Sequence, residues 1–197
     1  MSHTVIMSVA IAFAISVVFG PVVIPFLKRL KVGQTERDDG PKSHLKKSGT
    51  PTMGGILILI SVTVTSVLFI KDYPKIMPIL LVTLGFGLIG FLDDYIKVVL
   101  HRSMGLRAWQ KMLGQILVTA LFAYYMVNNA EVSLAMKIPF ITGKYVDWGI
   151  LNVPFLFIIV IATVNGANFT DGLDGLASSV TVMIATFFTA VAIGTAS

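Results

Sequence analysis

The chain has 197 residues, of which 55% are hydrophobic and only 13% are charged, and its mean hydropathy is +0.86. This composition excludes an ordinary soluble domain and indicates a polytopic membrane protein. The 197 residues include no cysteine, so they can form no disulfide, no thiolate metal site and no cysteine nucleophile. The net charge of +5 does not indicate a nucleic-acid partner, because the basic residues are gathered between apolar segments.

Six apolar segments predict an all-α fold, a polytopic transmembrane helical bundle with six spans. They run from about Thr4 to Leu27, Pro51 to Ile70, Ile76 to Leu92, Met112 to Val127, Ile150 to Val164 and Leu176 to Ile193. A helix of about 20 residues is roughly 30 Å long, which matches the hydrocarbon core of a bilayer. We expect Pro21 and Pro25 to kink the first helix. We also expect Thr50 and Pro51 to start the second helix, as its N-cap and first helical residue.

The basic residues predict which loops face the cytoplasm. Residues 28–50 and 93–111 carry eleven of the fifteen lysines and arginines. Cytoplasmic loops are enriched in these residues, so we predict that both segments are cytoplasmic and that the N-terminus lies outside. Residues 128–149 are predicted to include a small hairpin at the surface. No repeat or linker divides the chain, so we expect a single membrane domain over residues 1–197.

A polar, glycine-rich run separates the last two apolar segments: Asn165-Gly-Ala-Asn168-Phe-Thr-Asp171-Gly-Leu-Asp174-Gly175. A carboxylate in the bilayer core costs roughly 2.5–3.5 kcal/mol, so these groups should face water, a cavity, a cation or a substrate. Asp171 and Asp174 are three residues apart and would share one face of a helical turn, while Gly172 would allow close approach of a ligand. On a more ordinary interpretation, Thr170 or Asp171 only caps the helix that follows.

A second polar cluster, Lys46-Lys47-Ser-Gly-Thr50-Pro-Thr52-Met-Gly54-Gly55, precedes the second apolar segment. The free N–H groups of a helix N-terminus, with Lys47 just ahead of them, suit a phosphate. Alternatively, the lysines form a basic flank that anchors the helix to anionic lipid.

The third cluster is the adjacent pair Asp93-Asp94, which ends the third apolar segment. Neighbouring carboxylates repel each other and are tolerated best where a divalent cation holds one or both. Mg²⁺ prefers oxygen ligands and commonly bridges protein carboxylates to a diphosphate. Alternatively, Lys97 or Arg102 neutralises the pair at the membrane interface. Together the three clusters are predicted to converge on the cytoplasmic face and to carry phosphoryl transfer to or from a membrane-soluble acceptor.

Three motifs resemble a known family. They are Ser43-His44-Leu-Lys46-Lys47-Ser-Gly-Thr50-Pro-Thr-Met-Gly-Gly55, Gly90-Phe-Leu-Asp93-Asp94-Tyr95 and Asn168-Phe-Thr-Asp171-Gly-Leu-Asp174-Gly-Leu-Ala177. In this order they resemble the phospho-N-acetylmuramoyl-pentapeptide transferases (MraY), within the polyprenyl-phosphate N-acetylhexosamine-1-phosphate transferase superfamily.

The resemblance implies a multi-pass enzyme of the bacterial cytoplasmic (inner) membrane, with about ten transmembrane helices and a cytoplasmic active site. Such an enzyme works as a homodimer in the lipid bilayer and has no nucleic-acid partner. It transfers phospho-MurNAc-pentapeptide from UDP-MurNAc-pentapeptide to undecaprenyl phosphate with Mg²⁺, which gives lipid I and UMP for peptidoglycan synthesis.

The resemblance also implies roles for residues at the matching positions. Asp93 and Asp94 become the acidic catalytic pair, one a candidate base toward the lipid phosphate and either near the metal. Nothing in the sequence decides which of the two is the base. The residues implied to contact the uridine diphosphate end of the substrate are Lys47, Asp171, Gly172 and Asp174. Thr52 and Asn168 are implied to line the same cleft.

The chain departs from the family pattern in two places. Asn165-Gly-Ala-Asn168-Phe stands where the family commonly has Asn-Ala-Val-Asn-Leu, a mild change that should keep the chemistry. The chain also stops at Ser197, whereas the family continues through four more spans that carry another aspartate, implicated in metal binding, and a histidine-rich cytoplasmic loop. We therefore expect the N-terminal part of a longer enzyme, inactive alone.

Three alternatives stay open. A sibling transferase would use UDP-N-acetylglucosamine and a polyprenyl phosphate, although the segment from Lys47 to Gly55 favours the muramoyl branch. An ion-coupled transporter would place acidic residues near the middle of its spans, whereas here they lie at the ends. A prenyl-transfer enzyme would need a further acidic residue at the end of the run from Asp93 to Lys97 to bind a diphosphate, and this run has none there.

Overall fold

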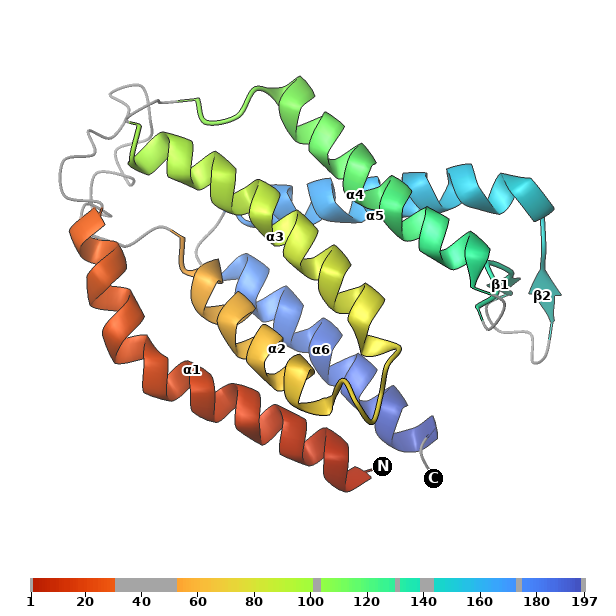
Figure 1. The fold of residues 1–197 in the computed structure, drawn as a ribbon, viewed down its shortest axis with the longest axis horizontal. Helices are drawn as coiled ribbons and strands as arrows, with labels where there is room; N and C mark the ends of the chain where they lie inside the picture. Colours follow the sequence, from red (N-terminus) through yellow and green to blue (C-terminus); the bar gives the residue numbers. More distant parts are fainter. Residues whose placement is uncertain are drawn as a thin grey trace. The chain divides into compact units, whose positions relative to one another are not determined.

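The computed structural model describes residues 2–30, 53–100, 104–129, 132–138, 144–172 and 175–195. The helices are α1 (Ser2–Leu30), α2 (Gly55–Phe69), α3 (Ile76–Val98), α4 (Ala108–Asn128), the short 3₁₀ helix η2 (Gly149–Leu151), α5 (Asn152–Thr170) and α6 (Leu176–Thr195). The strands are β1 (Met136–Lys137) and β2 (Tyr145–Val146). Each predicted apolar segment overlaps one α-helix (Figure 1), which confirms the helical fold class.

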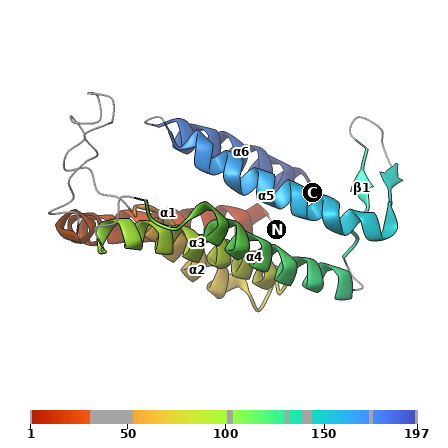
Figure 2. The same ribbon diagram turned by 90° about the horizontal axis from the view of Figure 1, so that it is seen from above.

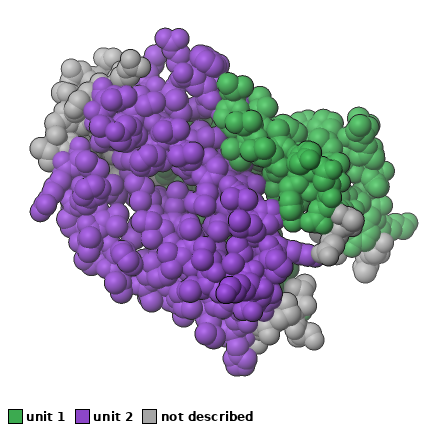
Figure 3. Space-filling view, in the orientation of Figure 1, with its two compact units in different colours: residues 1, 113–197 green, residues 2–112 purple. Residues whose placement is uncertain are grey.

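The chain divides into two compact units (Figure 3). Residues 2–112, purple and labelled unit 2 in the figure, come first in the sequence and form the first unit of the text; residues 113–197, green and labelled unit 1, form the second. The first unit contains α1, α2, α3 and the first turn of α4. The second contains the rest of α4, the two strands, η2, α5 and α6. The single membrane domain stays a prediction.

Four of the described helices are long and apolar enough to cross a membrane. These spans are His3–Leu30, Ile76–Val98, Gly149–Thr170 and Leu176–Gly194. Helix α2 is also apolar, but its 15 residues extend only about 22 Å. Helix α4 is long enough but more polar, because it carries Lys111 and Gln115.

Burial in the described residues departs from the pattern of a soluble protein, because the buried apolar residues there are only Leu27, Leu80, Val98 and Ala123. The buried polar residues are Ser61, Thr65, Asp93, Gln115, Thr119 and Asn152. Large apolar side chains such as Phe13 and Phe187 are instead more than 60% exposed. This distribution suits a lipid environment, in which polar groups need partners inside the protein and apolar side chains can face outward.

Helices α1 and α2 meet through small hydroxyl residues. Ser16 Oγ and Ser61 Oγ lie 2.8 Å apart, and each hydroxyl also lies 2.9 Å from a carbonyl oxygen of its own helix. Small residues let helix backbones approach closely in a membrane, where packing and hydrogen bonds replace the hydrophobic effect. Helix α1 is continuous through Pro21 and Pro25, and Figure 1 shows that it bends toward the end that contains them, as expected.

Two predicted helix ends are wrong because polar residues do not stop the helices. Helix α3 continues past Leu92 to Val98, where Asp93 and Lys97 form an i,i+4 ion pair within the helix. Helix α5 likewise continues past Val164 to Thr170.

The predicted start of α2 is also wrong. The helix begins at Gly55, because Met53 has a φ of 67°, a left-handed conformation that interrupts a right-handed helix. Thr50 and Pro51 lie outside the described residues.

The predicted hairpin is confirmed at the N-terminal end of α5 (Figure 2). Met136 pairs with Val146 and Lys137 with Tyr145, in antiparallel register. The chain then enters η2 and α5 through a cap in which Asp147 Oδ1 accepts hydrogen bonds from the Gly149 N–H and the Asn152 side-chain amide, at 2.8 and 2.6 Å.

Replacing Gly87 with valine is expected to destabilise the contact between α2 and α3. A Cβ at this position would lie 2.7 Å from Leu59 Cδ1, and overpacking of this kind costs about 1–3 kcal/mol. The measurement is the midpoint of thermal unfolding in detergent, followed by helical circular dichroism. Gly90→Val is the matched control on the same helix, because a Cβ there would meet no described atom within 4 Å. Equal losses in both variants would contradict the tight contact.

Candidate functional site

The acidic pair lies in the last turns of α3. Asp93 is only 7% exposed, a rare situation for an ionisable side chain, and one that requires compensating charges or hydrogen bonds. Helical geometry turns adjacent side chains about 100° apart, so Asp93 and Asp94 face different surroundings.

The carboxylate of Asp93 accepts hydrogen bonds from three donors. Its Oδ2 lies 2.5 Å from Lys97 Nζ and 2.8 Å from Lys111 Nζ. Its Oδ1 accepts a hydrogen bond from the Leu106 backbone N–H at 2.8 Å. The bonds tie three parts of the first unit together: the end of α3, the turn before α4 and the first turn of α4.

Gly105 allows that turn to approach the carboxylate. Its φ is +54°, which L-residues rarely adopt, and a Cβ at this position would lie 2.5 Å from Asp93 Oδ1. Two residues after Gly105, the Arg107 N–H donates to Gln110 Oε1 at 2.9 Å, which helps to start α4 at Ala108. The backbone of the turn is therefore shaped around Asp93.

Asp94 has looser surroundings. Its side chain is 40% exposed, compared with 10% for the side chain of Asp93. Among the described residues its ion-pair partner is Lys97, with 3.6 Å between Nζ and Asp94 Oδ1. The two carboxylates and the two lysine ammonium groups sum to zero charge, and Asp94 is the more exposed of the two carboxylates.

The sequence identified part of this cluster. The pairing with Lys97 is present, whereas Arg102 lies outside the described residues. Lys111, Gly105 and the Leu106 N–H were missed. A lysine in the first turn of an apolar helix needs an anionic partner, and this signal could have indicated Lys111.

The second group of candidate residues lies where α5 ends. Asn168 is in the last turn of α5, Asp171 is its C-cap residue, and Gly172 lies in the turn that follows; all three are exposed. Their exposure leaves the amide and the carboxylate accessible to a ligand. The interpretation of Thr170 or Asp171 as a cap for the next helix is wrong, because α6 begins only at Leu176 and Thr170 Oγ1 bonds to Gly166 O within α5.

A pair of amides joins α4 to α5 in the second unit. Asn165 Nδ2 donates to Gln115 Oε1 at 2.9 Å, and Gln115 Nε2 donates to Asn165 Oδ1 at 3.5 Å. Asn165 Nδ2 also donates to Ile161 O at 2.8 Å, and Gln115 is buried. Asn165, the first residue of the polar run, thus has an internal partner, and Asn168, three residues on, is exposed.

The remaining candidates, Lys47, Thr52 and Asp174, lie outside the described residues. Asp93 and Asp94 belong to the first unit, while Asn168, Asp171 and Gly172 belong to the second. The convergence of the three polar clusters on one face therefore stays a prediction. No group of three or more histidine, aspartate or glutamate side chains that could hold a metal occurs within the described ranges.

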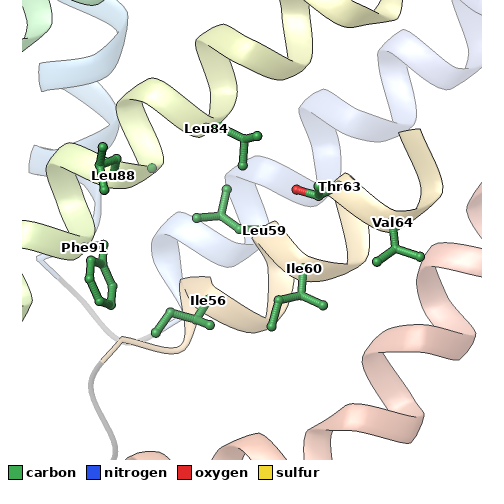
Figure 4. A pocket seen from close by; sticks show the side chains of 9 residues that line it. Ile56, Leu59, Ile60, Thr63, Val64, Leu84, Leu88 and Phe91 are labelled. Atoms are coloured by element: carbon green, nitrogen blue, oxygen red, sulfur yellow. The ribbon is translucent and has the colours of Figure 1, made fainter. Parts of the chain in front are cut away.

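An apolar groove of about 550 Å³ lies between α2 and α3. Its lining is Ile56, Leu59, Ile60, Thr63, Val64, Leu84, Gly87, Leu88 and Phe91 (Figure 4). Ile56 and Phe91 lie at the same end, and Phe91 also contacts the ring of Tyr95 at a centroid distance of 5.8 Å. Asp94 follows Phe91 by three residues on α3, so the acidic pair lies just beyond the end of an apolar helix surface.

Two sequence patterns match the chain. The profile of glycosyl transferase family 4 matches residues 76–197, which include the acidic pair and the end of α5. Signature 1 of the phospho-N-acetylmuramoyl-pentapeptide-transferases matches residues 47–59, which include Lys47, Thr52 and the start of α2.

Curated proteins named phospho-N-acetylmuramoyl-pentapeptide-transferase are similar to the chain. The protein of Acetivibrio thermocellus is 52% identical over 183 residues, which are 92% of this chain and 55% of the relative. The protein of Caldicellulosiruptor bescii is 48% identical over 188 residues, 95% of this chain and 58% of the relative. The protein of a Thermoanaerobacter species is 44% identical over 194 residues, 98% of this chain and 60% of the relative. The chain thus spans between 55% and 60% of the length of these relatives.

The Gln115–Asn165 pair is expected to couple α4 to α5 energetically. Interhelical hydrogen bonds in membranes contribute about 0.6 kcal/mol on average and up to about 1.7 kcal/mol. A double-mutant cycle with Gln115→Leu and Asn165→Leu should give a coupling free energy in this range, measured by unfolding in mixed micelles. If the two losses of stability simply add, the amides do not stabilise each other.

Proposed function

This chain belongs to glycosyl transferase family 4, and we propose that it is the part of a phospho-N-acetylmuramoyl-pentapeptide transferase that carries the acidic pair. The proposed reaction transfers phospho-MurNAc-pentapeptide from UDP-MurNAc-pentapeptide to undecaprenyl phosphate and forms lipid I and UMP. The observation that carries the proposal is the signature match at residues 47–59, because this signature is the one named for the phospho-N-acetylmuramoyl-pentapeptide-transferases.

In the proposed reaction a phosphate oxygen of the lipid attacks the β-phosphorus of the donor. The bond from the β-phosphorus to the bridging oxygen breaks, and UMP leaves with that oxygen. No redox partner is required. Catalysis of such a step is mostly positioning of the two substrates and neutralisation of their charges.

The chain's own residues divide between the two substrates. The acidic pair at the end of α3 is assigned to the reacting phosphates, and one carboxylate is assigned as the base toward the lipid phosphate. The exposed Asn168, Asp171 and Gly172, at the end of α5, are assigned to the uridine diphosphate end. Lys47, Thr52 and Asp174 are assigned to the same cleft from their sequence positions.

Magnesium dependence is part of the proposal, and the chemistry of the acidic pair fits the ion. Mg²⁺ is bound by one or two carboxylates together with substrate phosphates and several waters, so a large cluster of protein ligands is not needed. The exposed carboxylate of Asp94 offers such an oxygen. A bound Mg²⁺ would neutralise charge on the diphosphate as the leaving group departs.

The proposal includes an orientation and an assembly. The concentration of basic residues in residues 28–50 and 93–111 supports an external N-terminus and a cytoplasmic site in a multi-pass bacterial membrane protein. A homodimer is proposed from the family resemblance alone.

Donor choice tests the proposed reaction. Full-length protein in detergent, given undecaprenyl phosphate and Mg²⁺, is expected to release UMP from UDP-MurNAc-pentapeptide but not from UDP-N-acetylglucosamine. EDTA should abolish the release. UMP from the smaller sugar alone would move the protein to the sibling transferases, and no release from folded protein would reopen the transporter interpretation.

The Asp94→Asn variant of the full-length protein is expected to release UMP at least about 100-fold more slowly, because an amide can neither take up a proton nor bind the cation strongly. The variant should still elute as a folded species in detergent. Asp72→Asn, in the turn between α2 and α3, is the matched control and should keep wild-type turnover. Near-normal turnover by Asp94→Asn would remove Asp94 from the reaction.

A further inference from the structure

The two carboxylates of the acidic pair are held so differently that they cannot be equivalent in a reaction. Asp93 faces the turn and α4, and its carboxylate accepts hydrogen bonds from two ammonium groups and one backbone N–H. Asp94 faces another side of α3 and has one ion-pair partner among the described residues, at 3.6 Å.

We propose that Asp93 is a positioning residue, locked in place by Lys97, Lys111 and the turn at Gly105, and that Asp94 is the carboxylate that meets the divalent cation of a bound diphosphate. The diphosphate in this inference rests on the proposed function. The division of the pair rests on the contacts of the four residues around Asp93.

The first argument concerns charge. A carboxylate has about four acceptor positions, and Asp93 already uses three of them. A divalent cation that approached Oδ2 would meet the ammonium groups of Lys97 and Lys111, which repel it. The nearest described ammonium group to Asp94, that of Lys97, lies 3.6 Å away, and the Asp94 side chain is more exposed than that of Asp93. A cation that approached Asp94 would therefore be repelled less strongly.

The second argument concerns the turn. The Leu106 N–H donates to Asp93 Oδ1 beside Gly105, which has a positive φ and no side chain to meet that oxygen. A Cβ on Gly105 would also lie 2.7 Å from Lys97 Cε and 3.0 Å from Asp93 O, so the backbone is closed around the carboxylate. Groups packed this tightly hold a helix end and a turn in place. Asp93 thereby sets the orientation of the α3 turn on which Asp94 lies.

A metal-binding arm tests the division directly. Mn²⁺, a paramagnetic probe for Mg²⁺ sites, is titrated into the full-length protein in detergent with saturating UDP, and free Mn²⁺ is measured by electron paramagnetic resonance. Asp94→Asn is expected to weaken binding at least about 10-fold, whereas Asp93→Asn should weaken it by less than about 3-fold. An effect of Asp93→Asn equal to that of Asp94→Asn overturns the proposal.

A second experiment tests the positioning role with substitutions that remove no side chain able to bind the cation. Gly105→Ala is expected to lower kcat for UMP release at least about 10-fold, since small misplacements are costly, while the KM stays near wild type and the Kd for Mn²⁺ rises by less than about 3-fold, because the Asp94 carboxylate is still present. Gly149→Ala is the matched control, because Gly149 has a similar φ of +59° with no described atom within 4 Å of an added Cβ. Equal kcat values for Gly105→Ala and the control would contradict the claim that the turn at Gly105 holds Asp93 in position.

Lys111 provides a second positioning test that does not depend on the folding of Gly105→Ala. Lys111→Met should lower kcat, and Lys111→Arg should restore most of it, because arginine can still donate to Asp93 Oδ2. Equal loss in both variants would show that Lys111 does not act by positioning Asp93.

The outcomes separate this inference from the proposed function. If the wild type releases no UMP from either donor but Mn²⁺ binding depends on Asp94 alone, the function fails and the division of the pair stands. If UMP is released as proposed but Asp93→Asn and Asp94→Asn weaken Mn²⁺ binding equally, the function stands and the division fails.

Discussion

A buried carboxylate at the end of an apolar helix must be paired, and much of the first unit follows from this constraint at Asp93. Unpaired, a buried charge costs several kcal/mol. Lys97 supplies one ammonium group from the same helix, which requires α3 to stay helical through that residue. Lys111 supplies another from α4, and the Leu106 N–H supplies a neutral donor. The Asp93 carboxylate thus takes its three donors from the extended end of α3, the turn at Gly105 and the start of α4.

The elements of the fold could be predicted from the sequence, but several of their ends could not. Hydropathy identifies an apolar helix whatever its neighbours are. Charged residues look like helix ends, yet the ion pair of Asp93 with Lys97 lets α3 continue. The proline at residue 51 suggests a helix start, but the left-handed conformation of Met53 delays it to Gly55, and single-residue φ values leave no trace in composition.

The candidate site was predictable in its acidic residues and not in the groups that distinguish them. The motif identifies Asp93 and Asp94 as a pair, and the position of Lys97 four residues later suggests a partner. The contact from Lys111 depends on how the turn at Gly105 returns the chain, which is a tertiary property. The pairing of Gln115 with Asn165 is similarly invisible, because both residues lie in segments that would be helical without it.

The two polar contacts of α4 also differ in how far along the chain their partners lie. Lys111 bonds to a residue 18 positions earlier, whereas Gln115 bonds to one 50 positions later. A ribosome makes the chain from its N-terminus, so Asp93 is already present when Lys111 is added. The amide of Gln115 has no partner on α5 until residue 165 has been made. During synthesis, the charged end of α4 can therefore be neutralised first, and its buried amide is satisfied only after most of the next helix exists.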